Sequence, residues 1–334
     1  MIRINLALQG GGAHGAFTWG VLDRLLQEPD IEISGISGTS AGALNGAALK
    51  SGWLSGGAQG ARDNLDWLWS QMGALSNPEL ADWFQGMTAH FDAVMEAPWP
   101  MAIFDAAARL TTPYAFGPFY QNPLRPVVEA FHYDKVCAAS GPALFVGSTN
   151  VKSGKIRIFE QAEISTDALL ASACLPTLFQ AVEIAGEHYW DGGYSGNPAL
   201  FPLFEADLPD DIVVININPL YRDDIPKTPQ QIQNRINEIS FNSSLLRELR
   251  AIRFAQRLLS KGAVPKGVLK DVKVHMIADD DLMNDLSVST KLMPNPLVLA
   301  RLKKAGQAAA ERFLDAHKSD LGKRGTIDLQ EALG

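Results

Sequence analysis

A serine flanked by two glycines, in the run Gly38-Thr39-Ser40-Ala41-Gly42, is the pattern in this sequence best suited to covalent chemistry. A Gly-x-Ser-x-Gly run is typical of a tight turn between a strand and a helix, because glycine lets the backbone approach where a Cβ would not fit. Such a turn projects the serine hydroxyl at a helix N-terminus, whose free amides favour developing negative charge. We therefore predict that Ser40 is a nucleophile, although ordinary turns also produce this pattern.

A glycine-rich loop lies upstream of the serine, in the run Gly10-Gly11-Gly12-Ala13-His14-Gly15. The amides of Gly11 and Gly12 could hold an oxyanion, a role that needs glycine so that the backbone can approach a reacting carbonyl. Gly10, Gly12 and Gly15 also satisfy Gly-x-Gly-x-x-Gly, and Glu32 lies near the place of a ribose-binding acid, so an NAD(P) site is an alternative. A dinucleotide site has no need of an elbow serine, which favours the oxyanion interpretation. Plain structural turns at both places are a third interpretation.

A serine nucleophile needs a base, and Asp191 is the first candidate. It stands in Trp190-Asp191-Gly192-Gly193-Tyr194, after an extended segment, where Gly192 and Gly193 would let the carboxylate meet another loop closely. A Ser-Asp-His triad would instead draw on His275, at the end of a predicted strand. We expect His275 to be structural and the base to be Asp191.

These three motifs, taken in order over residues 2–202, resemble the patatin-like phospholipase family. The resemblance implies a Ser-Asp dyad in a three-layer α/β/α fold that hydrolyses lipid acyl esters without a cofactor. Ser40 falls on the family nucleophile, Asp191 on its base, and the amides around Gly11 and Gly12 on the oxyanion hole. His14 stands where the family commonly has arginine or lysine. Either a weaker positive charge there alters activity or substrate preference, or the side chain only braces the turn.

The elements that must position these residues follow from hydrophobic periodicity and predict an α/β fold. Residues 211–217 have the continuous β-branched character of a strand buried on both faces, which indicates a mostly parallel central sheet. Other strands are predicted at 2–8, 31–36, 144–149, 155–159 and 272–277, with one further extended segment at 182–190. Helices are predicted at 16–26, 167–173, 229–260 and 306–317.

We expect a single domain over residues 1–334 with two additions to the core fold. Residues 64–123 are rich in aromatic residues and proline, and we interpret them as an inserted helical cap. The cap could be ordinary core, or it could form an acyl-chain pocket or a lid that contacts the membrane surface transiently. Residues from about 222 to 334 are expected to form a C-terminal helical extension with one more strand.

Composition excludes several classes of function. A formal net charge of −8 over 334 residues argues against a nucleic-acid binder, which would rest on neutralising phosphates. No apolar run approaches the roughly 20 residues needed to span a bilayer, and no signal peptide is recognisable, so we expect a cytoplasmic protein, peripheral at the membrane if the cap contacts it. Cys137 and Cys174 form neither a disulfide framework nor a metal-ligand cluster, so no metal is expected. A catalytically silent lipid-binding protein of the same fold is the remaining alternative.

Overall fold

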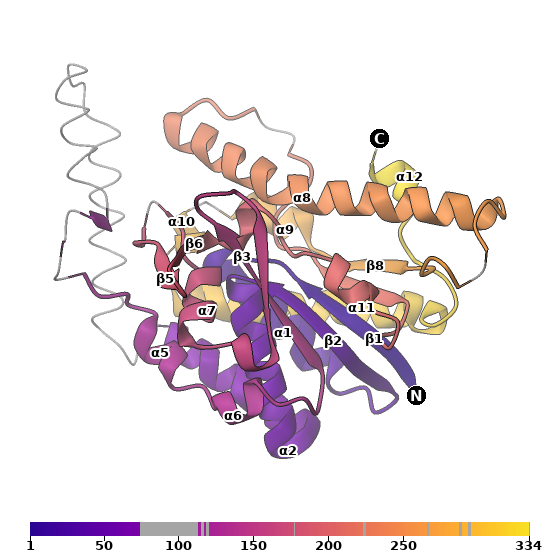
Figure 1. The fold of residues 1–334 in the computed structure, drawn as a ribbon, viewed down its shortest axis with the longest axis horizontal. Helices are drawn as coiled ribbons and strands as arrows, with labels where there is room; N and C mark the ends of the chain where they lie inside the picture. Colours follow the sequence, from indigo (N-terminus) through magenta and orange to yellow (C-terminus); the bar gives the residue numbers. More distant parts are fainter. Residues whose placement is uncertain are drawn as a thin grey trace.

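The computed structural model describes residues 1–73, 113–114, 117, 120–176, 178–222, 225–265, 267–286, 289–292 and 295–333. Most of the region predicted as an inserted cap, 64–123, therefore lies outside the described residues. The remainder contains all of the predicted site residues and the elements that position them (Figure 1).

A mixed sheet of eight strands forms the centre of the described part, in the order β5-β6-β3-β2-β1-β7-β8 with β4 pairing to β3. Neighbours along β3-β2-β1-β7-β8 are parallel, whereas β4, β5 and β6 pair antiparallel. The mostly parallel sheet predicted from the sequence is confirmed. The strand bounds are β1 Ile2–Leu8, β2 Ile31–Thr39, β3 Ala143–Asn150, β4 Ile156–Glu160, β5 Val182–Ile184, β6 Glu187–Asp191, β7 Asp211–Ile215 and β8 Lys273–Ile277.

Helices cover both faces of the sheet and complete the predicted three-layer α/β/α arrangement. Side chains of α1, α2 and α11 pack on one face in one buried cluster, and side chains of α8 pack on the other face in a second cluster. The helix bounds are α1 Gly15–Leu25, α2 Ala41–Met72, α5 Arg125–Glu129, α6 Tyr133–Val136, α7 Thr166–Ser172, α8 Pro229–Ser260, α9 Asp280–Asp285, α10 Ser289–Leu292, α11 Pro296–His317 and α12 Leu329–Ala332.

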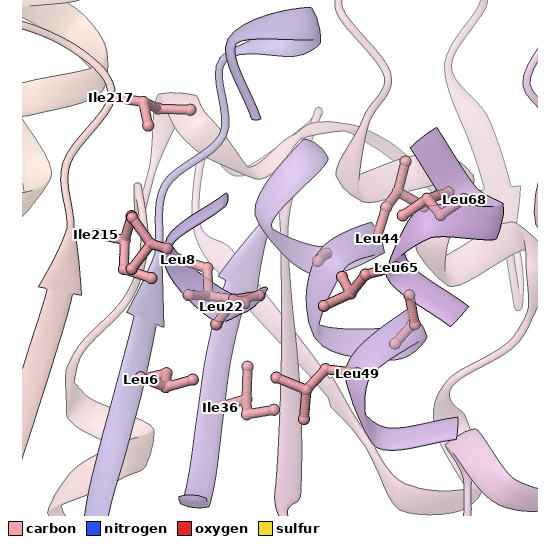
Figure 2. Close-up of a cluster of buried hydrophobic side chains, with 14 of the residues drawn as sticks. Leu6, Leu8, Leu22, Ile36, Leu44, Leu49, Leu65, Leu68, Ile215 and Ile217 are labelled. Atoms are coloured by element: carbon pink, nitrogen blue, oxygen red, sulfur yellow. The ribbon is translucent and has the colours of Figure 1, made fainter. Parts of the chain in front are cut away.

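Successive side chains of β1 point to opposite faces of the sheet, which determines the helix layer that each one contacts. Leu6 and Leu8 point to one face and contact the helix layer that contains Leu22, as Figure 2 shows, while Ala7 belongs to the cluster under α8. Burying one leucine contributes about 1.5–3 kcal/mol. This packing holds β1 and β2 side by side, so that the loops after them emerge at the same edge of the sheet.

Two local predictions differ from the structure. Residues 64–72, assigned to the cap from their tryptophans, belong to α2, whose second half follows a non-helical break at Gly56 and Gly57. The segment 182–190, predicted as one extended run, is the hairpin of β5 and β6. Its turn contains Ala185 and Gly186, both with positive φ, and alanine gives little sequence signal for such a turn.

The C-terminal part of the chain completes the core. Strand β8 pairs with β7 as the last strand of the sheet, and α11 packs closely on α1, since a Cβ added at Gly306 would lie 2.1 Å from the Phe17 carbonyl oxygen. Among the described helices, none has the length and hydropathy that a bilayer span requires.

Candidate active site

Ser40 stands at the turn between β2 and α2, in the geometry expected of a nucleophile elbow. Its backbone has φ 54° and ψ −125°, a positive-φ conformation outside the left-handed helical region that is rare for a residue with a Cβ. Gly42 allows the turn, because a Cβ there would lie 2.1 Å from the Leu8 carbonyl oxygen, and one at Gly38 would lie 2.7 Å from the Gly42 backbone. The Ser40 amide donates to Ser172 Oγ at 2.9 Å, which fixes the turn from the α7 side.

Asp191 ends β6 and reaches Ser40 through its side chain. The Asp191 side chain is 1% exposed, accepts a hydrogen bond from the Gly193 amide at 2.8 Å, and lies close enough to the Ser40 side chain for that group to help lower its pKa. Burial raises the pKa of Asp191 from 3.8 to about 7, and the Gly193 amide and the Ser40 side chain only partly oppose this effect. Gly192 lies against β3, where a Cβ would come 2.2 Å from the Gly147 carbonyl oxygen. The structure thus joins two side chains that are 151 positions apart in the sequence.

The glycine-rich loop packs against the serine turn. A Cβ at Gly10 would lie 2.7 Å from the Ser40 Cβ, and one at Gly15 would lie 2.7 Å from the Ala41 Cβ. The Gly10 amide is already occupied, because it donates to Asn197 Oδ1 at 2.7 Å. In contrast, neither the Gly11 nor the Gly12 amide donates to another of the described residues. The Gly11 and Gly12 amides are therefore free of other described partners and could stabilise a developing negative charge.

His14 is neutral at this site. Its side chain is 1% exposed, and its Nε2 lies 2.8 Å from Thr290 Oγ1. Burial, with the nearby charge of Lys291 as the next cause, lowers the pKa of His14 from 6.5 to about 3. The low pKa and the contact with Thr290 favour the interpretation that the His14 side chain braces the turn over the interpretation that it carries a weaker positive charge.

Lys291 of α10 lies beside the loop, where burial lowers its pKa and the charge of Glu238 opposes this effect. Its carbonyl oxygen would be 2.2 Å from a Cβ at Gly12, a residue with φ +58°, so α10 packs directly on the loop. Its Nζ donates to Asn218 Oδ1 at 3.2 Å and to Glu238 Oε1 at 3.1 Å. Burial would raise the pKa of Glu238, but its Arg222 and Lys291 partners outweigh burial and lower that pKa to about 2. Glu238 is thus a carboxylate, and the Lys291 ammonium is held in an ion pair.

A narrow cavity of about 60 Å³ opens beside Ser40. Ser40, Gly12 and Lys291 line one part of it. The rest of the described lining is apolar and includes Leu44, Met72, Leu124, Leu175, Leu178 and Phe179. A cavity with polar groups at one place and hydrocarbon elsewhere suits the junction between an ester group and an acyl chain.

Two residues from alternative hypotheses lie away from this cavity. His275 is on the last strand, β8, and its ring nitrogens contact Asp211 Oδ1 at 3.0 Å and Thr326 Oγ1 at 3.2 Å. It lies three strands from β2, roughly 14 Å across the sheet. Glu32 pairs in register with Arg3, near the start of β1, whereas the glycine loop follows the end of that strand. The acid required by a dinucleotide fingerprint is therefore at the opposite edge of the sheet.

Sequence reasoning missed the polar residues that hold the loop and the elbow. Asn197 and Asn218 both contact Gly10, since Asn218 Nδ2 donates to its carbonyl oxygen at 2.8 Å. Ser172 receives the Ser40 amide and donates to the Gly147 carbonyl oxygen at 2.7 Å. These residues come from distant parts of the chain and carry no local motif that would have identified them. Within the described residues, no group of histidine, cysteine, aspartate and glutamate side chains is arranged to hold a metal ion.

Comparisons with known proteins bear on the same residues. A family model described as Patatin-like phospholipase matches residues 6–206, more than half of the chain. Among solved structures, the chain is similar to VipD from Legionella pneumophila, with 15% identity and a TM-score of 0.44 over 95% of this chain and 67% of that one. It is also similar to a chain of the heterodimeric complex ExoU-SpcU from the type III secretion system of Pseudomonas aeruginosa, with 15% identity and a TM-score of 0.33 over 99% of this chain and 74% of that one. A comparison with curated proteins finds no match.

Proposed function

Since the chain belongs to the patatin-like phospholipase family, whose membership implies a lipid acyl hydrolase, we propose that it cleaves acyl esters of phospholipids or other lipids through a Ser40-Asp191 dyad. The observation that carries this proposal is the proximity of the Ser40 side chain, on a backbone of positive φ, to the buried carboxyl of Asp191, whose pKa it helps to lower. Strained backbone and a perturbed carboxyl at one point are typical of catalytic sites.

The chemistry follows from the groups in place. Asp191, in its ionised form, accepts the Ser40 proton as Oγ attacks the ester carbonyl carbon. The carbonyl oxygen becomes an oxyanion, which the Gly11 and Gly12 amides stabilise. The C–O bond to the leaving alcohol then breaks, and Asp191 returns the proton to that oxygen. Water repeats the sequence on the acyl-serine, with Asp191 again as the base, and releases the fatty acid.

The pKa of Asp191 suits this role. A base is most effective when its pKa lies near the operating pH, because it is then both available and able to hold a proton. A carboxyl with a pKa of about 7 meets that condition, whereas one at 3.8 would be a weak acceptor for a serine proton. The apolar cavity beside Ser40 supports an acyl chain as the neighbouring part of the substrate.

A fluorophosphonate probe separates this proposal from its two alternatives. The hydrolase predicts covalent labelling at Ser40, loss of labelling in Ser40→Ala, and turnover of a short-chain nitrophenyl ester that Ser40→Ala abolishes. A dinucleotide enzyme predicts NAD(P) affinity and no labelling, and a silent lipid-binding protein predicts neither. Turnover that survives in Ser40→Ala would remove Ser40 from the mechanism.

A further inference from the structure

The outward face of α8 carries a continuous stripe of apolar and basic residues. Its members follow one another at spacings of three and four, which places them on one side of a helix. The stripe consists of Ile232, Ile236, Ile239, Ser243, Arg247, Arg250, Phe254, Arg257 and Lys261, which caps the helix. Figure 1 shows α8 as the long orange helix along the margin of the molecule. We call these nine residues the α8 stripe.

The apolar members of the α8 stripe are exposed to an unusual degree. Ile232, Ile236 and Ile239 are 43%, 53% and 54% exposed, and Phe254 is 53% exposed. The opposite side of the same helix is packed in the core, with Leu245 and Leu249 in the cluster on the sheet. Single exposed apolar residues are ordinary, but three isoleucines in sequence on one helix face indicate a contact surface.

The charges of α8 contrast with those of the whole chain. The chain has a formal net charge of −8, whereas α8 contains five arginines and two glutamates, a net charge of +3. Both glutamates have partners within the molecule. Glu238 accepts a hydrogen bond from Lys291, and Glu248 accepts hydrogen bonds from the backbone amides of Leu200 and Phe201 at 2.8 and 2.9 Å. The α8 stripe therefore has no acidic side chain.

The stripe arginines, Arg247, Arg250 and Arg257, form no ion pair with another of the described residues. The charge of Arg247 acts on the neighbouring buried carboxyl of Glu248, whose pKa burial raises and Arg247 helps to lower. The Arg257 guanidinium carbon lies 5.4 Å from the centroid of the Phe254 ring. Basic residues next to exposed aliphatic and aromatic side chains are the signature of a helix that lies on an anionic lipid surface.

The inner side of α8 borders the candidate active site. Phe241 packs edge-on against Tyr194 at 5.1 Å between ring centroids, and a Cβ at Gly193 would come 3.1 Å from the Phe241 ring. Glu238 holds Lys291, whose backbone lies against Gly12. The isoleucines of the stripe thus lie on the far side of the same helix turns that support Asp191 and the glycine loop.

We propose that the α8 stripe is a docking surface for an anionic lipid bilayer, which would hold the protein on the surface that contains its substrate. The choice of a lipid surface rests on the proposed function. The isoleucines and Phe254 enter the interfacial region, and the arginines contact acidic headgroups. Charge complementarity favours this occupant over a second copy of the chain, because two copies of a basic stripe would repel each other.

Vesicle co-sedimentation with Ser40→Ala protein tests the proposal without hydrolysis. The protein should bind vesicles of phosphatidylcholine with phosphatidylserine more strongly than vesicles of phosphatidylcholine alone, and salt should weaken the binding. Replacing Arg247, Arg250 and Arg257 by glutamine should lower the partition coefficient by about 5-fold per residue, or about 100-fold together, at low salt. Replacing the three isoleucines by glutamine should lower it by about 5-fold each.

Matched controls come from α11, where Leu297 is 81% exposed and Arg301 and Lys304 are exposed as well. Leu297→Gln and the double variant Arg301→Gln, Lys304→Gln should leave vesicle binding unchanged. The arginine variants and the isoleucine variants test the same helix face by separate substitutions, so if one group of variants fails to fold, the other group still tests the proposal. Equal loss of binding in stripe and control variants would overturn the proposal, as would absence of binding to the acidic vesicles.

Two further measurements separate this inference from the proposed function. All stripe variants should hydrolyse a soluble short-chain nitrophenyl ester at the unaltered rate, because no bilayer is involved. A protein that binds vesicles through the stripe but hydrolyses no ester would refute the hydrolase and retain the docking surface. Analytical sedimentation measures the oligomeric state of the protein and of the stripe variants. If the protein is a dimer that the stripe substitutions dissociate, and if it does not bind vesicles, the stripe is a self-association surface and the lipid assignment is overturned.

Discussion

Replacing Asp191 by asparagine should stabilise the fold, and the gain should grow with pH. The buried carboxyl has a pKa of about 7 in the folded protein and an ordinary value of 3.8 when exposed. At neutral pH, ionising this carboxyl is therefore unfavourable in the folded protein and not in the unfolded chain, so ionisation lowers the free energy of unfolding. Asparagine keeps an oxygen that can accept the Gly193 amide, so the substitution removes the charge and preserves the shape.

The sign and size of the effect follow from the two pKa values. Below about pH 4 the carboxyl is protonated in both states and contributes no penalty. Between about pH 4 and pH 7 only the unfolded chain ionises, so stability falls by about 1.4 kcal/mol per pH unit. Above about pH 7 both states are ionised, and the loss levels off at about 4 kcal/mol. The advantage of Asp191→Asn should thus be about 1.5 kcal/mol at about pH 5 and about 4 kcal/mol at about pH 8.

Urea unfolding of both proteins at several pH values measures this difference. Asp23→Asn is the matched control, because hydrogen bonds from Arg62 and Gln307 outweigh burial and lower the pKa of Asp23. Its ionised form stabilises the fold, so Asp23→Asn should destabilise it at neutral pH and lose that effect in acid. A stability difference for Asp191→Asn that does not change with pH would show equal pKa values in both states and refute the reasoning.

Four shorter predictions concern activity on a short-chain nitrophenyl ester. The acid limb of kcat/KM should lie near pH 7, because Asp191 must be ionised to accept the serine proton, and a limb near pH 4 would contradict its burial. Gly12→Ala should lower kcat by about 100-fold, the loss expected when one oxyanion donor is removed. The φ of Gly12 is +58° and the Lys291 carbonyl oxygen leaves no room for a Cβ, so the substitution should displace the amide. A change in KM alone would argue against the assignment of the Gly12 amide to the oxyanion hole. Lys291→Met should lower kcat by about 10-fold through the loop, and by more than His14→Gln does, since His14 is neutral. His275→Ala should cost about 1–3 kcal/mol in the free energy of unfolding with unchanged kcat, and an equal loss of activity in Asp191→Asn and His275→Ala would favour a triad.

Much of the sheet could be predicted because its strands are buried, and burial on both faces requires apolar side chains that are visible in the sequence. The run of Ile212, Val213, Val214 and Ile215 has no polar interruption, and the structure buries all four in β7. The glycine turns after β1 and β2 were predictable for the same local reason, because sharp turns restrict residue type. Helix α8 was predicted with its observed bounds, which the capping box at Thr228 and the proline that follows explain.

Elements without local signals were missed. A non-helical break at Gly56 and Gly57 divides α2 into two halves, and the second half carries tryptophans that suggested a separate cap. Trp69 is core, 3% exposed, with its indole N–H donated to Asn45 Oδ1 at 2.9 Å. Composition identifies aromatic residues but does not say which surface they pack against.

The same limit applies within the candidate site. The three motifs were visible because each constrains its own backbone over a few residues. Lys291 was not visible, because its relation to Gly12 depends on α10 crossing the loop after more than 270 intervening residues. Its ion pair with Glu238 adds a third distant segment. Motifs therefore supplied the candidates for the reacting groups, whereas the residues that position these candidates could be identified only in the folded chain.

The candidate site concentrates its unfavourable features at Ser40 and Asp191, the two residues of the proposed dyad. Ser40 has a positive-φ backbone conformation that costs about 1–3 kcal/mol for a residue with a Cβ, and Asp191 has lost its hydration. Neither feature helps the fold, and both are maintained because β2 and β6 end in a packed sheet that cannot relax around them. A relaxed turn would withdraw the hydroxyl, and a hydrated carboxylate would lose its affinity for the proton. If the dyad is the catalytic centre, substitutions that relieve either cost should stabilise the protein and reduce its activity together.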